Sequence, residues 1–407
     1  MPQRRTVPSP PRAFVEQFQR QVTDFLSRLD RPESSQLLAA LKVHTEQEMA
    51  AIAAFEGRRA TYLEAIATTS DYPGLRRLEE ALATLEAERF LLYRSVPGLH
   101  HGCTEYRDRL AARTLQLVED EVAVLGLGPA PCRYALVSMG SDGRGEQTLI
   151  TDQDYLIVHE DGNAVVDDYF RRFSELLVER LAAVGFKKCT GDIMPSNPTW
   201  RGSISQWRQR LNAIVRYEFD EYAKNLMDLI VLSDARYVAG DRTLAENQIE
   251  SIREFEQGYF QVIWGMAKAA AEMKVGLRSF GRIWTDPKGE YKGLFNVKLL
   301  GWAPLVMNVR ILAVNLGLAA TSTLQRLELL EERKSLSPGS AAALREAYHV
   351  LTRHRILLQI RYLKGEQTES YHLDPKNLSK DEREELRQAL VSIEELQTVI
   401  RTNFSIL

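Results

Sequence analysis

The sequence of 407 residues lacks several features that would assign it to a particular class of protein. Its three cysteines, Cys103, Cys132 and Cys189, are odd in number and widely spaced, which suits a reducing cytoplasm better than a disulfide framework and fits no zinc-binding spacing. No apolar run approaches the roughly 20 residues that a membrane-spanning helix needs. The basic, proline-rich N-terminus is not followed by the apolar stretch of a secretory signal. We therefore expect a cytoplasmic protein without a membrane partner.

The sequence also lacks an excess of charge of one sign. It holds 52 lysine and arginine residues against 55 aspartate and glutamate residues, which gives a formal net charge of −3. Because phosphate-rich partners usually need a basic face, this balance argues against a nucleic acid as partner, although a local basic patch is compatible with it. The length predicts two or three domains, each with its own core.

Helical periodicity dominates the chain before and after one mixed segment. Helices are predicted at 14–29, 34–67, 75–93 and 104–125. The mixed segment has predicted strands at 133–139 and 152–159, a helix at 164–184 and a short strand at 186–189. Beyond it we expect a helix that carries both Trp200 and Trp207, an element of undecided type at 226–238, and a last helix that begins at a capping box of Ser379 and Glu382. The expected fold is α+β and mostly helical, with a small mixed sheet flanked by N-terminal helices and a C-terminal helical bundle.

One loop between the two predicted strands carries the candidate chemistry, GSDGRGEQTLITDQD at positions 140–154. Asp152 and Asp154 are two residues apart in a predicted strand, so their carboxylates point to one face and offer hard oxygen ligands suited to Mg²⁺. Gly140 and Ser141 end the preceding strand, where the backbone and the hydroxyl can hold a phosphate, and Arg144 adds a fork-shaped donor. These parts suit nucleotidyl transfer assisted by two Mg²⁺ ions. A solvated acidic turn remains the alternative, and the loop has neither a Walker nor a dinucleotide-binding pattern.

The same loop resembles the signature of the DNA polymerase β-type nucleotidyltransferase superfamily. More closely, it is similar to the nucleotidyltransferase family often fused to CBS domains, which is related to the uridylyltransferase of the PII signalling protein. The likeness extends to NPTWR at 197–201 with Trp207, to DARYVAGD at 234–241, and to Asn296, Lys298, Pro304 and Arg310. It covers roughly residues 104–407. Tyr155, Asn296 and Asn308 depart from the family pattern.

The resemblance implies three domains. They are an N-terminal helical region at 1–103, in which no CBS or cyclic-nucleotide module is detected, a polymerase β-like nucleotidyltransferase domain at 104–241, and a helical substrate-binding domain at 242–407. It also implies a third catalytic acid, for which Asp234 is our first choice and Asp228 and Asp192 are competitors. Glu146 and Gln147 are expected to shape the loop or contact the nucleotide, or else to hydrogen-bond the backbone of their own loop. The cluster of His100, His101 and Cys103 is interpreted as surface rather than as a metal site.

The resulting hypothesis is a Mg²⁺-dependent nucleotidyltransferase active in signal transduction. It would move an NMP from ATP or UTP to a hydroxyl acceptor, for which we favour a side chain of a regulatory protein. Asp152 and Asp154 would hold the metal, while Gly140, Ser141 and Arg144 would hold the triphosphate. Two alternatives stay open: a nucleotide-sensing or scaffold protein with little catalysis, and transfer to a small molecule or RNA. The sequence leaves the oligomeric state open.

Overall fold

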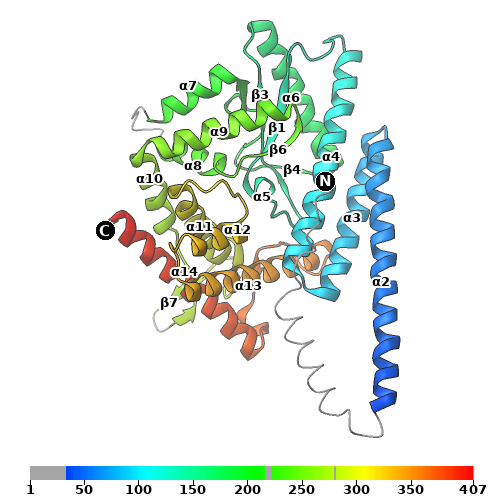
Figure 1. Cartoon of the computed structure of the whole chain (residues 1–407), viewed down its shortest axis with the longest axis vertical. Coiled ribbons are helices and arrows are strands. Elements are labelled where there is room, and N and C mark those ends of the chain that lie inside the picture. The colour runs from blue at the N-terminus through cyan, green and yellow to red at the C-terminus, as the bar shows by residue number, and fades with distance from the viewer. Residues whose placement is uncertain (1–33, 216–221, 279–280, 407) are drawn as a thin grey trace. The chain divides into compact units, whose positions relative to one another are not determined.

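The computed structural model describes residues 34–215, 222–278 and 281–406. The predicted helix at 14–29 lies outside these residues. The chain divides into two compact units, residues 1–64 and 65–407 (Figure 1).

The first unit is described from residue 34 onward and consists there of one long helix, α2 (Ser34–Thr68), whose last residues belong to the second unit. This confirms the helix predicted at 34–67. The apolar side that the sequence indicates is largely solvent-exposed, since Leu41, Met49 and Ile52 are 46%, 65% and 46% exposed. Phe55 is buried. The helical period of α2 therefore does not translate into a continuous buried face.

The second unit is built around a four-stranded mixed sheet in the order β5-β3-β1-β6. The central strand β1 runs antiparallel to both β3 and β6, and β5 runs parallel to β3. Every residue of β1 and β3 is buried, which is why both read as short apolar runs in the sequence. The strands are β1 (Tyr134–Ser138), β3 (Tyr155–His159), β5 (Arg201–Ser203) and β6 (Arg236–Gly240).

The strand predicted at 152–159 is divided in two, and this is a correction. β2 (Asp152–Gln153) pairs in parallel with β4 (Lys187–Lys188) as a separate ladder, and Asp154 lies between β2 and β3. The chain changes ladders there because the backbone N–H of Tyr155 donates to Ile193 O at 3.2 Å instead of continuing the β2 pairing.

Helices cover the sheet and continue into a C-terminal bundle (Figure 1). The α6 helix coincides with the prediction at 164–184 and is capped by Asn163. The prolines at 73 and 97 lie in the first turns of α3 and α4. The backbone N–H that proline lacks would have no hydrogen-bond partner within the helix at these positions. The helices are α3 (Tyr72–Tyr93), α4 (Val96–Val124), α5 (Gly140–Gly143), α6 (Ala164–Val184), α7 (Ile204–Val215), α8 (Tyr222–Leu232), α9 (Arg242–Gly258), α10 (Phe260–Ala271), α11 (Ala303–Asn315), α12 (Thr323–Glu332), α13 (Pro338–Leu363) and α14 (Lys380–Phe404).

Several short elements connect them. They are the 3₁₀ turns η1 (Pro198–Trp200) and η4 (Pro375–Asn377), the π-helical turn η3 (Lys298–Trp302), and the strands β7 (Leu277–Arg278), β8 (Arg282–Ile283), β9 (Phe295–Asn296) and β10 (His372–Leu373). The expected helix with both Trp200 and Trp207 is wrong, because Trp200 ends η1 and only Trp207 lies in α7. The undecided stretch at 226–238 contains the end of α8 and the start of β6.

The α+β, mostly helical fold class is confirmed. The capping box at the start of α14 is also confirmed, since Ser379 and Glu382 exchange both bonds. The expected boundary between 103 and 104 falls inside the continuous helix α4, and the division into three domains stays a prediction. No described helix combines the length and the apolar character needed to cross a membrane.

Candidate active site

The end of β1 and the start of β3 bring the predicted glycine turn next to the predicted carboxylate pair. In this antiparallel pair Ser138 lies opposite Tyr155, and the N–H of Met139 donates to Asp154 O at 2.8 Å. Gly140 follows with φ of +58°, and a Cβ built on it would lie 2.5 Å from Asp154 Oδ2. Only glycine fits this position, so the Asp154 carboxylate lies directly against the turn.

Asp152 and Asp154 form a carboxylate pair that is only partly exposed. Burial, with the neighbouring charges of Asp152 and Asp142, raises the pKa of Asp154 to about 6, although a hydrogen bond from the Cys189 thiol works in the opposite direction. A cation bound between two carboxylates that repel each other stabilises the charged form of both.

The pair fits Mg²⁺ as a ligand set. Its donors are hard oxygens, and Mg²⁺ characteristically takes one or two carboxylates and completes its shell with waters and substrate phosphates. Among the described residues no three His, Cys, Asp or Glu side chains are grouped so that they could hold a metal ion. Metal bound here would take Asp152 and Asp154 as its carboxylate ligands.

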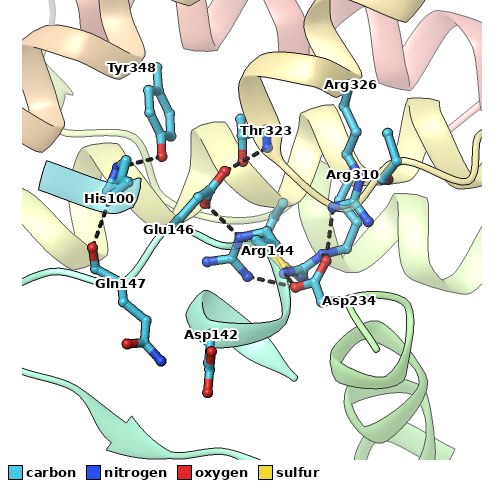
Figure 2. A network of polar contacts seen from close by, with 12 residues as sticks. His100, Asp142, Arg144, Glu146, Gln147, Asp234, Arg310, Thr323, Arg326 and Tyr348 are labelled. Atoms are coloured by element: carbon cyan, nitrogen blue, oxygen red, sulfur yellow. Dashed lines mark hydrogen bonds and ion pairs between the residues drawn. The ribbon is translucent and has the colours of Figure 1, made fainter. Parts of the chain in front are cut away.

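A second set of residues from the same loop lies in a buried ion-pair network (Figure 2). Arg144 donates from Nη1 to Asp234 Oδ2 at 2.6 Å and from Nε to Glu146 Oε2 at 2.7 Å. Asp234 is fully buried and also accepts from Arg326 Nη1 at 2.9 Å and from Arg310 Nε at 3.2 Å. Burial alone would raise the pKa of Asp234, but the three guanidinium groups outweigh it and hold the pKa below its ordinary value.

This network gives the predicted residues Arg144, Glu146 and Asp234 structural partners. Both oxygens of Asp234 are taken by arginines, and the structure does not group Asp234 with Asp152 and Asp154 as ligands of one metal. Glu146 accepts the backbone N–H of Thr323 at 2.5 Å, so it bonds to α12 and to Arg144 rather than to its own loop's backbone.

The competitors for the third acid do not complete the pair either. Asp192 is exposed and accepts from Asn197 Nδ2 at 3.0 Å, and Asp228 lies in α8. Among the described residues, neither belongs to a group of three His, Cys, Asp or Glu side chains that could hold a metal ion.

The sequence interpretation missed the buried position of His100. The ring Nδ1 lies 2.8 Å from Gln147 O and Nε2 lies 3.0 Å from the hydroxyl of Tyr348 in α13. Burial lowers the pKa of His100 to about 4, so the ring is neutral at pH 7. The spacing of His100, Cys103 and Arg107, all buried, follows one face of α4 and would have revealed this once the helix was begun at Val96.

The sequence interpretation also missed the buried Arg355 in α13, whereas it singled out Gln147 of the loop together with Glu146. Arg355 and Gln147 both have polar side-chain atoms that make no hydrogen bond in the structure. No periodicity or motif marks Arg355, because it is distinguished only by the hydrogen-bond partners that it lacks among the described residues.

Two family models match the chain. One, described as "Putative nucleotidyltransferase DUF294", matches residues 76–221, and the other, described as "Putative nucleotidyltransferase substrate binding domain", matches residues 260–404. Together they cover more than two thirds of the sequence. The chain belongs to this nucleotidyltransferase family. No curated protein matches it. Gly140, Asp152 and Asp154 lie within the first matched region of the family, and Arg355 lies within the second.

Proposed function

We propose that the protein is a Mg²⁺-dependent nucleotidyltransferase that moves an NMP from ATP or UTP to a hydroxyl acceptor. The observation that carries this proposal is the Asp152–Asp154 pair, with Asp154 lying against the Gly140 turn. The match of this region to a nucleotidyltransferase family supports the same reaction class.

The reaction joins the acceptor oxygen to the α-phosphorus and breaks the bond between that phosphorus and the bridging oxygen. The hydroxyl loses its proton, and pyrophosphate leaves. Asp152 and Asp154 would hold Mg²⁺, which when bound supplies charge neutralisation at the attacking and leaving oxygens. Because Gly140 has no side chain, the Asp154 carboxylate takes the space that a Cβ would fill, which brings this metal ligand next to the turn that would hold a substrate phosphate.

For the acceptor we favour a hydroxyl side chain of a regulatory protein. The support is the resemblance of the loop to the relatives of the PII uridylyltransferase, and the match of residues 260–404 to a substrate-binding domain, which would bind the acceptor. The intact carboxylate pair supports an enzyme over a nucleotide sensor with little catalysis.

The test is the double variant Asp152→Asn, Asp154→Asn, incubated with each α-labelled NTP and a lysate of the host. Loss of the metal ligands should reduce label transfer by more than about 100-fold, while the fold persists because two repelling charges are removed. Asp120→Asn changes an exposed carboxylate of α4 and should leave transfer unchanged.

Three outcomes decide between the readings. Undiminished transfer by the double variant overturns the assignment of the pair. Binding of NTP by the unaltered protein without any labelled product supports the sensor. Label on RNA or on a small molecule, rather than on a protein, would redirect the choice of acceptor.

A further inference from the structure

Arg355 is a buried cation that pairs with no carboxylate among the described residues. Its side chain comes from α13, the residue is 6% exposed, and neither Nε nor Nη1 has a hydrogen-bond partner. None of the ion pairs among the described residues joins Arg355 to a carboxylate. Arginine stays charged in proteins, and burying a charge without a partner is costly. An unpaired buried group of this kind calls for a ligand that the protein binds.

The surroundings of Arg355 hold its guanidinium in place without using its donors. The group lies over the Trp302 ring at 4.3 Å from the centroid, and Arg144 lies over the same ring at 5.3 Å. The charge of Arg144 is compensated by Asp234 and Glu146, whereas that of Arg355 is not. Stacking on an aromatic face fixes the plane of a guanidinium and leaves its N–H edge open.

Arg355 lies within electrostatic range of Asp152, one member of the carboxylate pair. Burial lowers its pKa, and the nearby negative charge of Asp152 is among the influences that oppose this. At the same edge Lys187 lies opposite Asp152 in the β2–β4 ladder, and its Nζ is 5.4 Å from the ring of Tyr362, also of α13. Positive charge from α13 and β4 thus borders the site where a metal would be held.

Gln147 is another buried side chain whose polar atoms make no hydrogen bond to the described residues. It is 1% exposed, and neither Nε2 nor Oε1 makes a hydrogen bond. Its backbone oxygen contacts His100, which contacts Tyr348, and Tyr348 lies two turns before Arg355 on α13. In Figure 2 the Gln147 side chain points away from His100 and Tyr348. The loop is therefore fixed to α13 through its backbone, and the amide remains available.

We propose that Arg355 and Gln147 bind the phosphate chain of the nucleoside triphosphate beside Asp152 and Asp154. The nature of the ligand rests on the proposed function. The guanidinium fork matches phosphate oxygens, and the Gln147 amide adds a donor that burial has stripped of water. Arg144, expected from the sequence to do this, already donates to Glu146 and Asp234. A helix of the region matched as substrate-binding thus completes the nucleotide site.

The experiment compares Arg355→Gln with Arg353→Gln by isothermal titration. Arg353 lies on the same helix, is partly exposed and pairs with Glu385, so it controls for the loss of one positive charge from α13. The probes are ATP, UTP and inorganic triphosphate, each with Mg²⁺. Loss of a charge-assisted contact should weaken binding of all three by about 10- to 100-fold in Arg355→Gln. Arg353→Gln should stay within about twofold.

A thermal melt without ligand separates binding from folding. Arg355→Gln removes an unpaired buried charge, so its Tm should equal or exceed that of the unaltered protein. A lower Tm together with unchanged affinities would show a structural role and overturn the proposal. Arg355→Lys keeps the positive charge but loses the fork-shaped donor set of the guanidinium. Its affinity for the three probes should fall between that of the unaltered protein and that of Arg355→Gln.

The outcomes distinguish this proposal from the proposed function. If the unaltered protein binds all three probes and Arg355→Gln binds them weakly, the phosphate site stands even when no acceptor is labelled. If both bind equally while the Asp152, Asp154 variant loses transfer, the phosphate site is overturned and the transferase stands. Failure of the unaltered protein to bind any of the three probes overturns the phosphate site.

Discussion

Asp154 is the residue at which the Gly140 turn, the proposed metal site and the buried surroundings meet. Its backbone oxygen accepts the Met139 N–H, its carboxylate lies against Gly140, and its pKa is raised to about 6. A carboxyl group whose pKa is higher in the folded protein favours folding only while it is protonated. Its contribution is full below the unfolded pKa of about 4 and is lost as the pH rises through about 6.

Asp154→Asn should therefore become more stable relative to the unaltered protein as the pH rises from about 4 to 6, with no further gain above that range. The reason is that asparagine carries no charge to desolvate beside Asp152. Urea unfolding in the presence of EDTA at several pH values measures the difference. A difference that stays constant across this range would show that the Asp154 carboxyl has no raised pKa.

Asp161→Asn provides a control of the opposite sign. Hydrogen bonds from Ser203 and Ser205 lower the pKa of Asp161 to about 2, so its contribution is present above the unfolded pKa and is lost as the pH falls. That variant should be less stable than the unaltered protein at neutral pH, and the difference should shrink in acid.

At the scale of elements, local sequence patterns correctly predicted the strands, helices and caps that are determined by neighbouring residues. The strand at 134–138, the helix at 164–184 and the cap at Ser379 follow from short runs, helical period and side chains that bond their own backbone. The break at Asp154 could not be predicted, because it depends on Ile193 O accepting the N–H of Tyr155.

For the candidate site too, the sequence predicts the contacts that depend on neighbouring segments and misses those that depend on distant ones. The proximity of Gly140 and Asp154 follows from two strands joined by one loop, and the sequence predicts it. The roles of Arg144 and Asp234 depend on arginines 76 and 92 residues beyond Asp234, and the DARYVAGD motif carries no sign of them. A buried acid surrounded by arginines and a catalytic acid look alike in a sequence.

Asp234 connects the turn before β6 to α11 and α12, and Asp234→Asn tests that connection. Removing its charge leaves three buried guanidinium groups without their shared partner, so the free energy of unfolding should fall by about 3–5 kcal/mol. Glu331→Gln breaks the pair between α12 and α13, in which both side chains are about one third exposed, and should cost less than about 1 kcal/mol. Urea unfolding measures both. If both variants lost the same free energy of unfolding, the buried network around Asp234 would contribute no more than a partly exposed ion pair.

At the scale of the whole molecule, the two regions matched as separate families belong to one compact unit, residues 65–407. Buried contacts join them directly, such as His100 with Tyr348 and Glu146 with Thr323, which are 248 and 177 residues apart in the sequence. Asp234 lies between the two regions and bonds to Arg144 of the first and to Arg310 of the second, which are 90 and 76 residues away. Contacts at such separations form only as the unit folds, which is why neither period nor motif predicts them.

We expect residues 76–221 and 260–404 to unfold together. Pulsed hydrogen exchange across a urea series, read by mass spectrometry, should give the same midpoint for peptides of both regions, because buried hydrogen bonds join them and Asp234 bonds to arginines of both. Asp234→Asn should move both midpoints by the same amount, since it weakens the connection for both sides. Peptides of 260–404 that unfold at lower urea than those of 76–221 would show two independent domains. In that case a phosphate site formed from Gln147 and Arg355 would exist only while the two stay docked.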